Sequence, residues 1–181
     1  MLTRLLIVVS VLVAGGIIFI LIARRTPSTV VVERTFAAPI KTVWEHWSRP
    51  DSIRKWWSPK GYTAPVVESD FVVGGKFLFA MESPSGVRHY NAGRYTEITP
   101  HSRIVSTLSF SDEKGNAIAG AEVPVPGVWP DSVLVEVDFS EVDGKTRVVV
   151  KEHGIPMLMK ILAKMGWSQQ FDKFEKLLAD G

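Results

Sequence analysis

The sequence predicts an α+β fold in which a curved antiparallel sheet wraps around a long C-terminal helix, preceded by one transmembrane helix. Three observations predict this fold. An uncharged apolar run extends from Leu5 to Ala23, β-branched and aromatic segments separated by turn signals fill the stretch from Val66 to His153, and an amphipathic segment closes the chain from about Pro156 to Ala179. Short turns between consecutive strands permit only antiparallel neighbours.

The apolar run from Leu5 to Ala23 has the length of a membrane-spanning helix. At 1.5 Å per residue it extends about 28 Å, close to the roughly 30 Å of a bilayer's hydrocarbon core. A cleaved signal peptide is the competing interpretation, but its apolar region is shorter and ends in a small-residue cleavage site. Here the run stops at Arg24-Arg25-Thr26-Pro27 without an Ala-x-Ala pattern. We therefore expect an uncleaved anchor (1–25), a short linker (26–28) and one domain (29–181), with the membrane as a partner.

The charges favour a single-pass membrane protein whose domain faces the cytoplasm. Arg24, Arg25, Arg34 and Lys41 follow the apolar run, whereas only Arg4 and the α-amine precede it. The net charge is +2 with no basic stripe, so no nucleic-acid partner is expected. The chain has no cysteine, which excludes disulfides, a thiolate nucleophile and Cys-ligated zinc.

A strand and two short helices are predicted before the run of strands. The segment Thr29–Phe36 is rich in β-branched residues, and Pro39 suits the first position of a helix. The apolar stripes of the two helices are Ile40, Val43, Trp44 and Trp47, and then Ile53, Trp56 and Trp57. The later strands are predicted over 66–72, 76–82, 87–98, 103–110, 132–142 and 145–153.

The dipeptide Asp143-Gly144 permits a register prediction for the last two strands. As a two-residue hairpin loop it pairs Val142 with Lys145, which places Glu136 opposite Lys151 as an exposed ion pair. The face that points at the C-terminal helix then carries Val133, Val135, Val137, Phe139, Val148 and Val150.

Glu152 is the strongest polar candidate inside a cavity. The register turns it inward beside Val135, and a lone acid on an apolar face must be paired, hydrated or protonated. Two alternatives stay open: Glu152 reaches water at the strand end, or a one-residue bulge exchanges it with His153.

A strongly curved sheet closed by one helix leaves room for an apolar ligand. The connection 111–131 is long, apolar and rich in proline, which fits a lid or binding loop and fits cover for a sheet edge equally well. The candidate ligand-binding residues, each of which alone also fits an ordinary core, are Phe77, Phe79, Met81, Trp129, Val133, Val135, Val137, Val150, Glu152, Ile161 and Met165.

Signals for catalysis are weak. The four histidines, His46, His89, His101 and His153, lie on different elements without the spacing of metal ligands, and neither a Gly-x-Ser-x-Gly elbow nor a phosphate-binding glycine loop occurs. We predict no catalytic residue, no metal site and no cofactor.

Several strings between Val30 and the C-terminus carry a family resemblance. They are Thr35–Pro39 with Val43-Trp44, Arg54–Gly61, Asp70 with Gly74-Gly75, Gly93–Ile98, Phe110–Asn116, Asp143–Thr146, His153–Pro156 and Gly166–Phe174. Together they resemble the START-like (SRPBCC, helix-grip) superfamily, in its branch of activator of heat-shock-protein-90 ATPase homologues, also labelled polyketide-cyclase-like. The resemblance implies a hydrophobic ligand held between sheet and long helix, although some members bind the chaperone and some are cyclases or other enzymes.

The resemblance gives three functional hypotheses. The first is membrane-anchored binding of a lipid-like or polyketide-like molecule, the second a chaperone-interacting ATPase activator, and the third a cyclase or hydrolase with Glu152 or Asp138 as general base. The chain departs from the family in its added anchor and in the segment Ala117–Val125, which is small and apolar where relatives commonly carry a polar string. That loss counts against an enzyme and favours a more apolar ligand.

Overall fold

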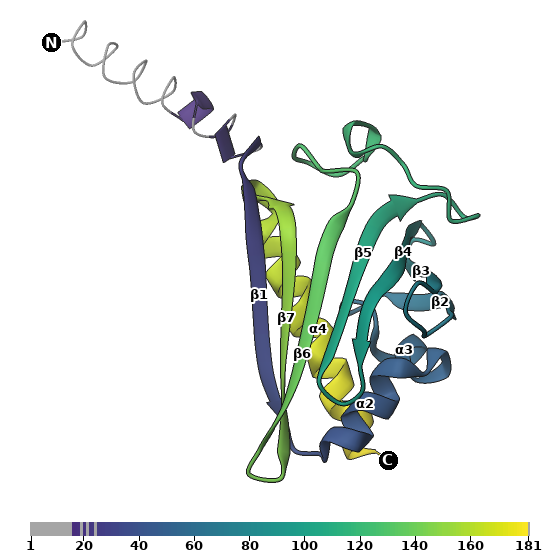
Figure 1. Ribbon diagram of the computed structural model, residues 1–181. Helices are drawn as coiled ribbons and strands as arrows, with labels where there is room; N and C mark the ends of the chain where they lie inside the picture. The colour runs from purple at the N-terminus through teal and green to yellow at the C-terminus, as the bar shows by residue number, and fades with distance from the viewer. Residues whose placement is uncertain (1–15, 19, 21, 24, 181) are drawn as a thin grey trace, which may run out of the picture.

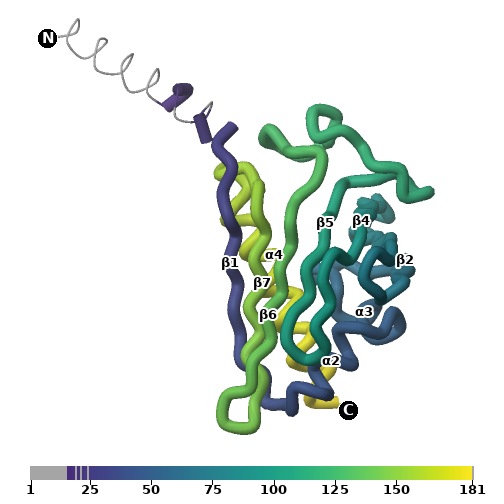
Figure 2. Tube along the Cα trace, viewed as in Figure 1, coloured from purple at the N-terminus to yellow at the C-terminus, as the bar shows by residue number. Residues whose placement is uncertain are grey.

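Seven strands form one antiparallel sheet in the computed structural model of the chain, which describes residues 16–18, 20, 22–23 and 25–180 (Figure 1). Every neighbouring pair is antiparallel, as predicted for the strands that short turns join. In spatial order the strands are β1 (Pro27–Phe36), β7 (Lys145–Pro156), β6 (Val133–Val142), β5 (Arg103–Ser111), β4 (Arg88–Thr99), β3 (Lys76–Glu82) and β2 (Thr63–Ser69). The first strand of the chain therefore lies beside the last (Figure 2).

Three α-helices of the described residues 27–180 pack on one face of this sheet. The two short ones, α2 (Ile40–Ser48) and α3 (Pro50–Trp56), follow β1, and the long one, α4 (Lys160–Ala179), ends the domain (Figure 1). The described part of the chain also has two 3₁₀ turns, η1 (Gly120–Glu122) in the long loop and η2 (Met157–Met159) before α4. This arrangement is the predicted curved sheet closed by a C-terminal helix.

An aromatic cluster joins the helices to β1. The ring of Phe36 packs edge-on against Phe174 of α4 at a centroid distance of 4.9 Å, and Trp56 of α3 lies 5.0 Å from the same ring. All three side chains are almost fully buried. Burial of large aromatic side chains is the dominant stabilising contribution in a core of this size.

Lys173 ties α4 to the loop after α3. Its ammonium group donates to the Ser58 hydroxyl at 2.7 Å and to the Tyr62 carbonyl at 2.8 Å, and one turn earlier Gln169 accepts a bond from the Lys60 backbone N–H at 3.0 Å. Two of the strings that carry the family resemblance, Arg54–Gly61 and Gly166–Phe174, therefore meet in space and hold each other.

The β6–β7 hairpin has the predicted register. Val142 pairs with Lys145 and Glu136 with Lys151, because Asp143 and Gly144 both adopt positive φ as a two-residue turn requires. The predicted ion pair between Glu136 and Lys151 is wrong. On the outer face of the sheet Lys151 instead forms an ion pair with Asp138 at 3.1 Å. Arg103 of the neighbouring β5 forms an ion pair with Glu136 at 3.2 Å.

The predicted start of the long helix is also wrong. β7 continues to Pro156, η2 takes the next three residues, and α4 begins at Lys160. Pairing with β1 explains the difference, since Pro27 lies opposite Pro156 and the Met157 backbone N–H donates to the Thr26 carbonyl at 2.9 Å. Strand pairing thus overrides the local helical pattern.

Most of the predicted anchor, Leu5–Ala23, lies outside the residues that the structure describes. Within 16–18, 20, 22–23 and 25–180, no helix has both the length and the apolar character needed to cross a membrane.

Candidate functional site

A cavity of about 220 Å³ lies between the sheet and the helices. Its walls come from α2, α3, strands β3 to β7, the long loop and α4. Side chains of the predicted set that line it are Phe77, Phe79, Met81, Trp129, Val133, Val135, Val137 and Glu152. Eight of the eleven candidates are thus brought together at one site.

Three predicted residues lie elsewhere. Val150 is buried in the core, with 1% of its surface exposed, and does not line the cavity. Ile161 and Met165 are on the outside of α4, with 73% and 51% of their surfaces exposed. Their placement in the cavity was wrong because α4 turns a different face inward.

The inward face of α4 presents Ala163, Trp167 and Gln170 to the cavity. These positions are spaced four and three residues apart, so they form one stripe that continues into the buried Phe171 and Phe174. Extending that stripe backwards from the two phenylalanines would have found all three. Gln170 was missed because a polar residue does not count in an apolar pattern.

Glu152 lies in a row of side chains that crosses five strands on the cavity face. Register pairs link Tyr95 to Ser106, Ser106 to Val135, Val135 to Glu152 and Glu152 to Val30. Directly opposite residues in antiparallel strands share one face of the sheet. No bulge exchanges Glu152 with His153, and the inward orientation predicted from the hairpin count is correct.

Burial raises the pKa of Glu152 to about 7, and a hydrogen bond from the Trp167 indole opposes this only in part. The residue keeps some accessible surface because it faces the cavity. A carboxyl group with this pKa is held in both protonation states near neutral pH, so it can donate or accept a hydrogen bond inside the cavity.

Gln170 supplies a second polar group one turn along α4 from Trp167. The side chain is 5% exposed, and its Oε1 atom has no hydrogen-bond partner among the described residues. A buried carbonyl oxygen without a partner costs free energy that a ligand's donor group can recover. Glu152 and Gln170 therefore place two polar groups in the wall of a mostly apolar cavity, whose other polar lining residues include Asn91, Ser106 and Ser109.

Aromatic rings build the wall on the β3–β4 side. Phe79 packs against Trp57 at 4.8 Å, and Phe77 lies 5.0 Å from Phe79 and 5.1 Å from Tyr95. Gly93 makes room for Phe77, because a Cβ atom there would lie 2.4 Å from the ring. Burial raises the pKa of Tyr95 to about 12, so its hydroxyl stays protonated and bonds the Ser69 hydroxyl at 2.9 Å.

The long loop 112–132 closes part of the cavity with Trp129. The indole N–H of Trp129 donates to the Val125 and Pro126 carbonyls, both at 3.2 Å, and the ring packs edge-on against Phe110 at 5.1 Å. Asp131 accepts the Gly120 backbone N–H at 2.8 Å, which fastens η1 to the end of the loop. Of the two interpretations, cover for a sheet edge and a wall of the site, the position of Trp129 fits the second.

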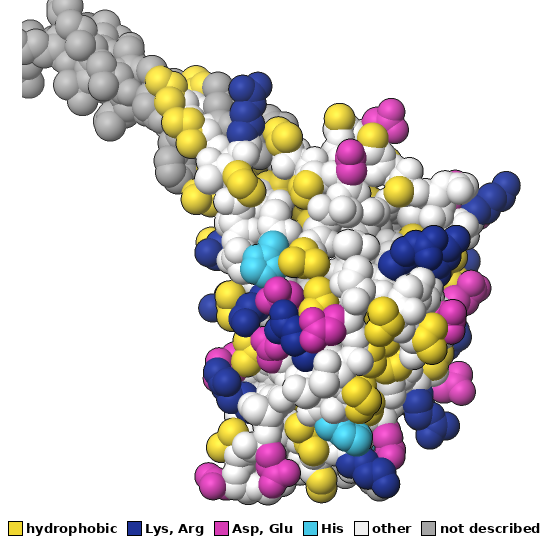
Figure 3. Space-filling view, in the orientation of Figure 1, with side chains coloured by type: hydrophobic (Ala, Val, Ile, Leu, Met, Phe, Trp, Pro, Cys, Tyr) yellow, Lys and Arg dark blue, Asp and Glu magenta, His cyan; other side chains and the backbone are white. Residues whose placement is uncertain are grey.

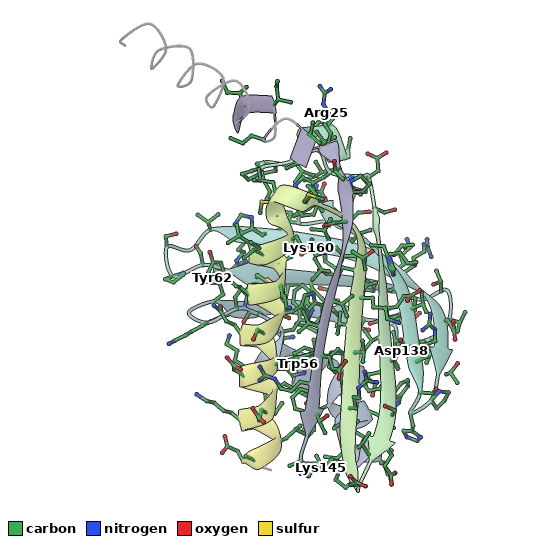
Figure 4. All side chains as sticks on the ribbon, turned by 90° about the vertical axis from the view of Figure 1, so that its left-hand side faces the viewer. Arg25, Trp56, Tyr62, Asp138, Lys145 and Lys160 are labelled. Atoms are coloured by element: carbon green, nitrogen blue, oxygen red, sulfur yellow. The ribbon has the colours of Figure 1, made fainter. Side chains whose placement is uncertain are left out.

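Asp138, the other proposed general base, lies on the opposite face of the sheet from the cavity (Figure 4). Partial burial opposes its ionisation, but hydrogen bonds from Lys151 and Arg103 outweigh this and hold its pKa below the ordinary value. Figure 3 shows this outer face, where acidic and basic side chains gather over the central strands. Among residues 16–18, 20, 22–23 and 25–180 no group of three His, Cys, Asp or Glu side chains could hold a metal ion.

Comparison with known proteins identifies related sequences and folds. The sequence model of the family described as Activator of Hsp90 ATPase homolog 1-like protein matches residues 37–179. A solved protein of Chromobacterium violaceum is 23% identical with a TM-score of 0.69, covering 83% of this chain and 96% of that one. The AHSA1 protein of Silicibacter pomeroyi is 20% identical with a TM-score of 0.67, covering 84% and 98%.

A solved protein of Arthrobacter aurescens is similar to the same extent, with 21% identity, a TM-score of 0.70, and coverage of 84% of this chain and 87% of that one. At these identities the likeness shows a shared fold. No curated protein matches this chain significantly.

Proposed function

This chain belongs to the family of Activator of Hsp90 ATPase homolog 1-like proteins, and from that premise we propose that it is a membrane-anchored protein that holds a hydrophobic small molecule between its sheet and α4. The observation that carries the proposal is the cavity of about 220 Å³, walled mostly by aromatic and aliphatic side chains, with Glu152 and Gln170 among its few polar groups. Small-molecule sites are concave and mostly apolar, with a few polar groups that fix the ligand's orientation.

The volume of the cavity limits the size of the ligand. An apolar cavity of about 150 Å³ binds benzene, so about 220 Å³ suits one or two fused rings or a short alkyl chain. A lipid-like or polyketide-like ligand would place only its compact part inside.

The anchor in this proposal is the apolar run Leu5–Ala23, whose support is its sequence. Only Arg24, Arg25 and Thr26 separate it from β1, which begins at Pro27. The domain would therefore be held next to the bilayer, where apolar compounds concentrate.

Replacement of Val135 by arginine tests the cavity. The guanidinium would enter the cavity beside Glu152, its cross-strand neighbour, so the new charge has a partner and the fold is expected to persist. The full chain would be purified in nanodiscs of one synthetic lipid, and bound small molecules extracted and identified by mass spectrometry. We expect a compound that wild type retains and Val135→Arg loses.

Val31→Arg is the matched control, because Val31 is 46% exposed on β1 and the same substitution leaves the cavity intact. Circular dichroism would confirm that both variants are folded. Identical extracts from wild type and both variants would exclude a ligand held in this cavity.

Family membership favours a second function, interaction with a chaperone and stimulation of its ATPase. Co-purification with the cognate chaperone and an ATPase assay test it directly. Stimulation that persists in Val135→Arg would assign this activity to the surface of the domain, independent of the cavity, whereas the absence of both binding and stimulation would exclude it.

A further inference from the structure

Five large apolar side chains stand exposed on η2 and the first turns of α4. They form what we call the α4 apolar patch: Met157, Leu158, Ile161, Leu162 and Met165, with exposed fractions of 44%, 42%, 73%, 57% and 51%. Soluble surfaces rarely leave a contiguous apolar group of this size uncovered, and such a patch marks an interaction site.

Farther along α4 the exposed face is charged. Asp172, Glu175 and Lys176 are exposed there, and Asp172 pairs with Arg34 of β1 at 2.7 Å. The same helix thus changes from an apolar to a charged outer surface within its length. Exposure to water is sufficient to explain the charged C-terminal part of this face. It does not explain the apolar N-terminal part.

The patch begins directly beside the end of the predicted anchor. The Met157 backbone N–H donates to the Thr26 carbonyl at 2.9 Å, and Pro156 pairs with Pro27. Figure 4 shows Arg25 and Lys160 at the same end of the domain and Lys145 at the other. A membrane reached by the run Leu5–Ala23 would therefore lie against this end.

Basic side chains flank the patch. Lys160 and Lys164 lie between the apolar positions of the patch in the sequence of α4. Arg25 directly precedes Thr26, whose carbonyl accepts the hydrogen bond from Met157. All three basic side chains are exposed. Apolar side chains bordered by lysine and arginine are the composition of a helix that lies in a bilayer interface, where the cations meet anionic headgroups.

We infer that the α4 apolar patch inserts into the headgroup region of an anionic lipid bilayer, an inference that rests on the proposed membrane anchor. The domain then contacts the membrane through its own surface as well as through the anchor. Ala163, in the same turns of α4, lines the cavity. The contact therefore brings one wall of the cavity to the bilayer surface, which gives an apolar ligand a route that avoids water.

The absence of cysteine from the chain allows a site-specific test. Leu158→Cys places a probe in the patch, and Val142→Cys is its matched control, since both side chains are 42% exposed and Val142 lies at the hairpin on the opposite end. Each full-length variant would be labelled with the fluorophore NBD and reconstituted into phosphatidylcholine–phosphatidylglycerol vesicles that carry doxyl-labelled lipid. We expect at least twofold stronger quenching at position 158 than at 142.

Two further measurements distinguish a failure of the proposed anchor from a failure of the proposed patch insertion. A vesicle flotation assay after an alkaline wash reports on the anchor alone: a chain that does not float with the vesicles overturns the proposed anchor and this inference with it. A chain that floats but shows equal quenching at 158 and 142 overturns only the patch. A blue-shifted probe at 158 without lipid quenching also overturns it, because the patch is then covered by protein.

The charge contribution is tested with Lys160→Glu combined with Lys164→Glu. Quenching at position 158 should fall by about half in the double variant and with vesicles of phosphatidylcholine alone, whereas Lys145→Glu, at the far end, should leave it unchanged.

Discussion

Glu152 places a titratable group where the folded domain shields it from bulk water. Its pKa of about 7 in the folded state lies above the ordinary 4.5, so the native state binds more protons than the unfolded chain between these two pH values. The free energy of unfolding therefore falls as pH rises from about 4.5 to 7 and is flat beyond, by about 3 kcal/mol in total.

Glu152→Gln should remove this pH dependence. The amide keeps the size and the hydrogen-bonding capacity of the protonated acid but does not ionise, so the variant should match wild type at pH 4 and exceed its stability at pH 8. Urea denaturation across that range measures the difference. Glu68→Gln, at an exposed position of β2, is the control, and a wild-type profile in Glu152→Gln would contradict the assignment.

Gln170 should select ligands that carry a hydrogen-bond donor. Its unpartnered Oε1 would accept a hydrogen bond from the hydroxyl of 2-naphthol, whereas 2-methoxynaphthalene has no donor to offer. One net hydrogen bond should make the affinity for 2-naphthol about fivefold to tenfold higher. Gln170→Met keeps the length of the side chain and removes the acceptor, so the ratio of the two affinities should fall close to one. Calorimetric titration of both compounds measures it, and an unchanged ratio would show that Gln170 does not contact the ligand.

At the scale of elements, α4 depends on its attachment to the loop after α3. Lys173→Met should destabilise the domain by about 1–3 kcal/mol, because the Ser58 hydroxyl loses its donor and the Tyr62 carbonyl keeps only the hydrogen bond from Ser58. Lys176→Met removes an exposed lysine three residues farther on the same helix and should change stability by less than about 0.5 kcal/mol. Chemical denaturation compares the two, and equal effects would argue against the attachment.

The strands and their register were predictable because their information is local. Turn residues divide the chain into antiparallel neighbours, and Asp143-Gly144 alone determines which residues of β6 and β7 face each other. That count correctly turned Val135 and Glu152 toward α4. The ion pairs of the outer face were not predictable in the same way, since Arg103 enters from β5, a strand outside the hairpin.

The inward face of α4 shows where apolarity is an insufficient guide. Ile161 and Met165 are as apolar as any core residue, yet they lie outside, while the polar Gln170 lies inside. A hydrophobic pattern identifies side chains that avoid water and does not say whether a sheet, a ligand or another surface covers them. For this reason both helix-side candidates lie outside the cavity, whereas all the sheet-side candidates except Val150 line it.

At the scale of the whole molecule, the order of the strands decides which surfaces meet. β1 and β7 are neighbours, so the start of the domain and the start of α4 lie at one end, and the β6–β7 hairpin lies at the other (Figure 2). No local pattern in Thr26 or Met157 indicates that they touch. This contact becomes visible only when strands separated by more than a hundred residues are paired.

The hydrogen bond between Thr26 and Met157 also has a kinetic consequence. It fixes the end of the short segment that joins the proposed anchor to β1. In the proposed arrangement the cavity therefore stays close to the bilayer and samples a small area of lipid. The search for a ligand is then two-dimensional, and the concentration that governs occupancy is the one dissolved in the bilayer. A scarce compound that partitions strongly into lipid would fill the cavity before an abundant one that stays in water.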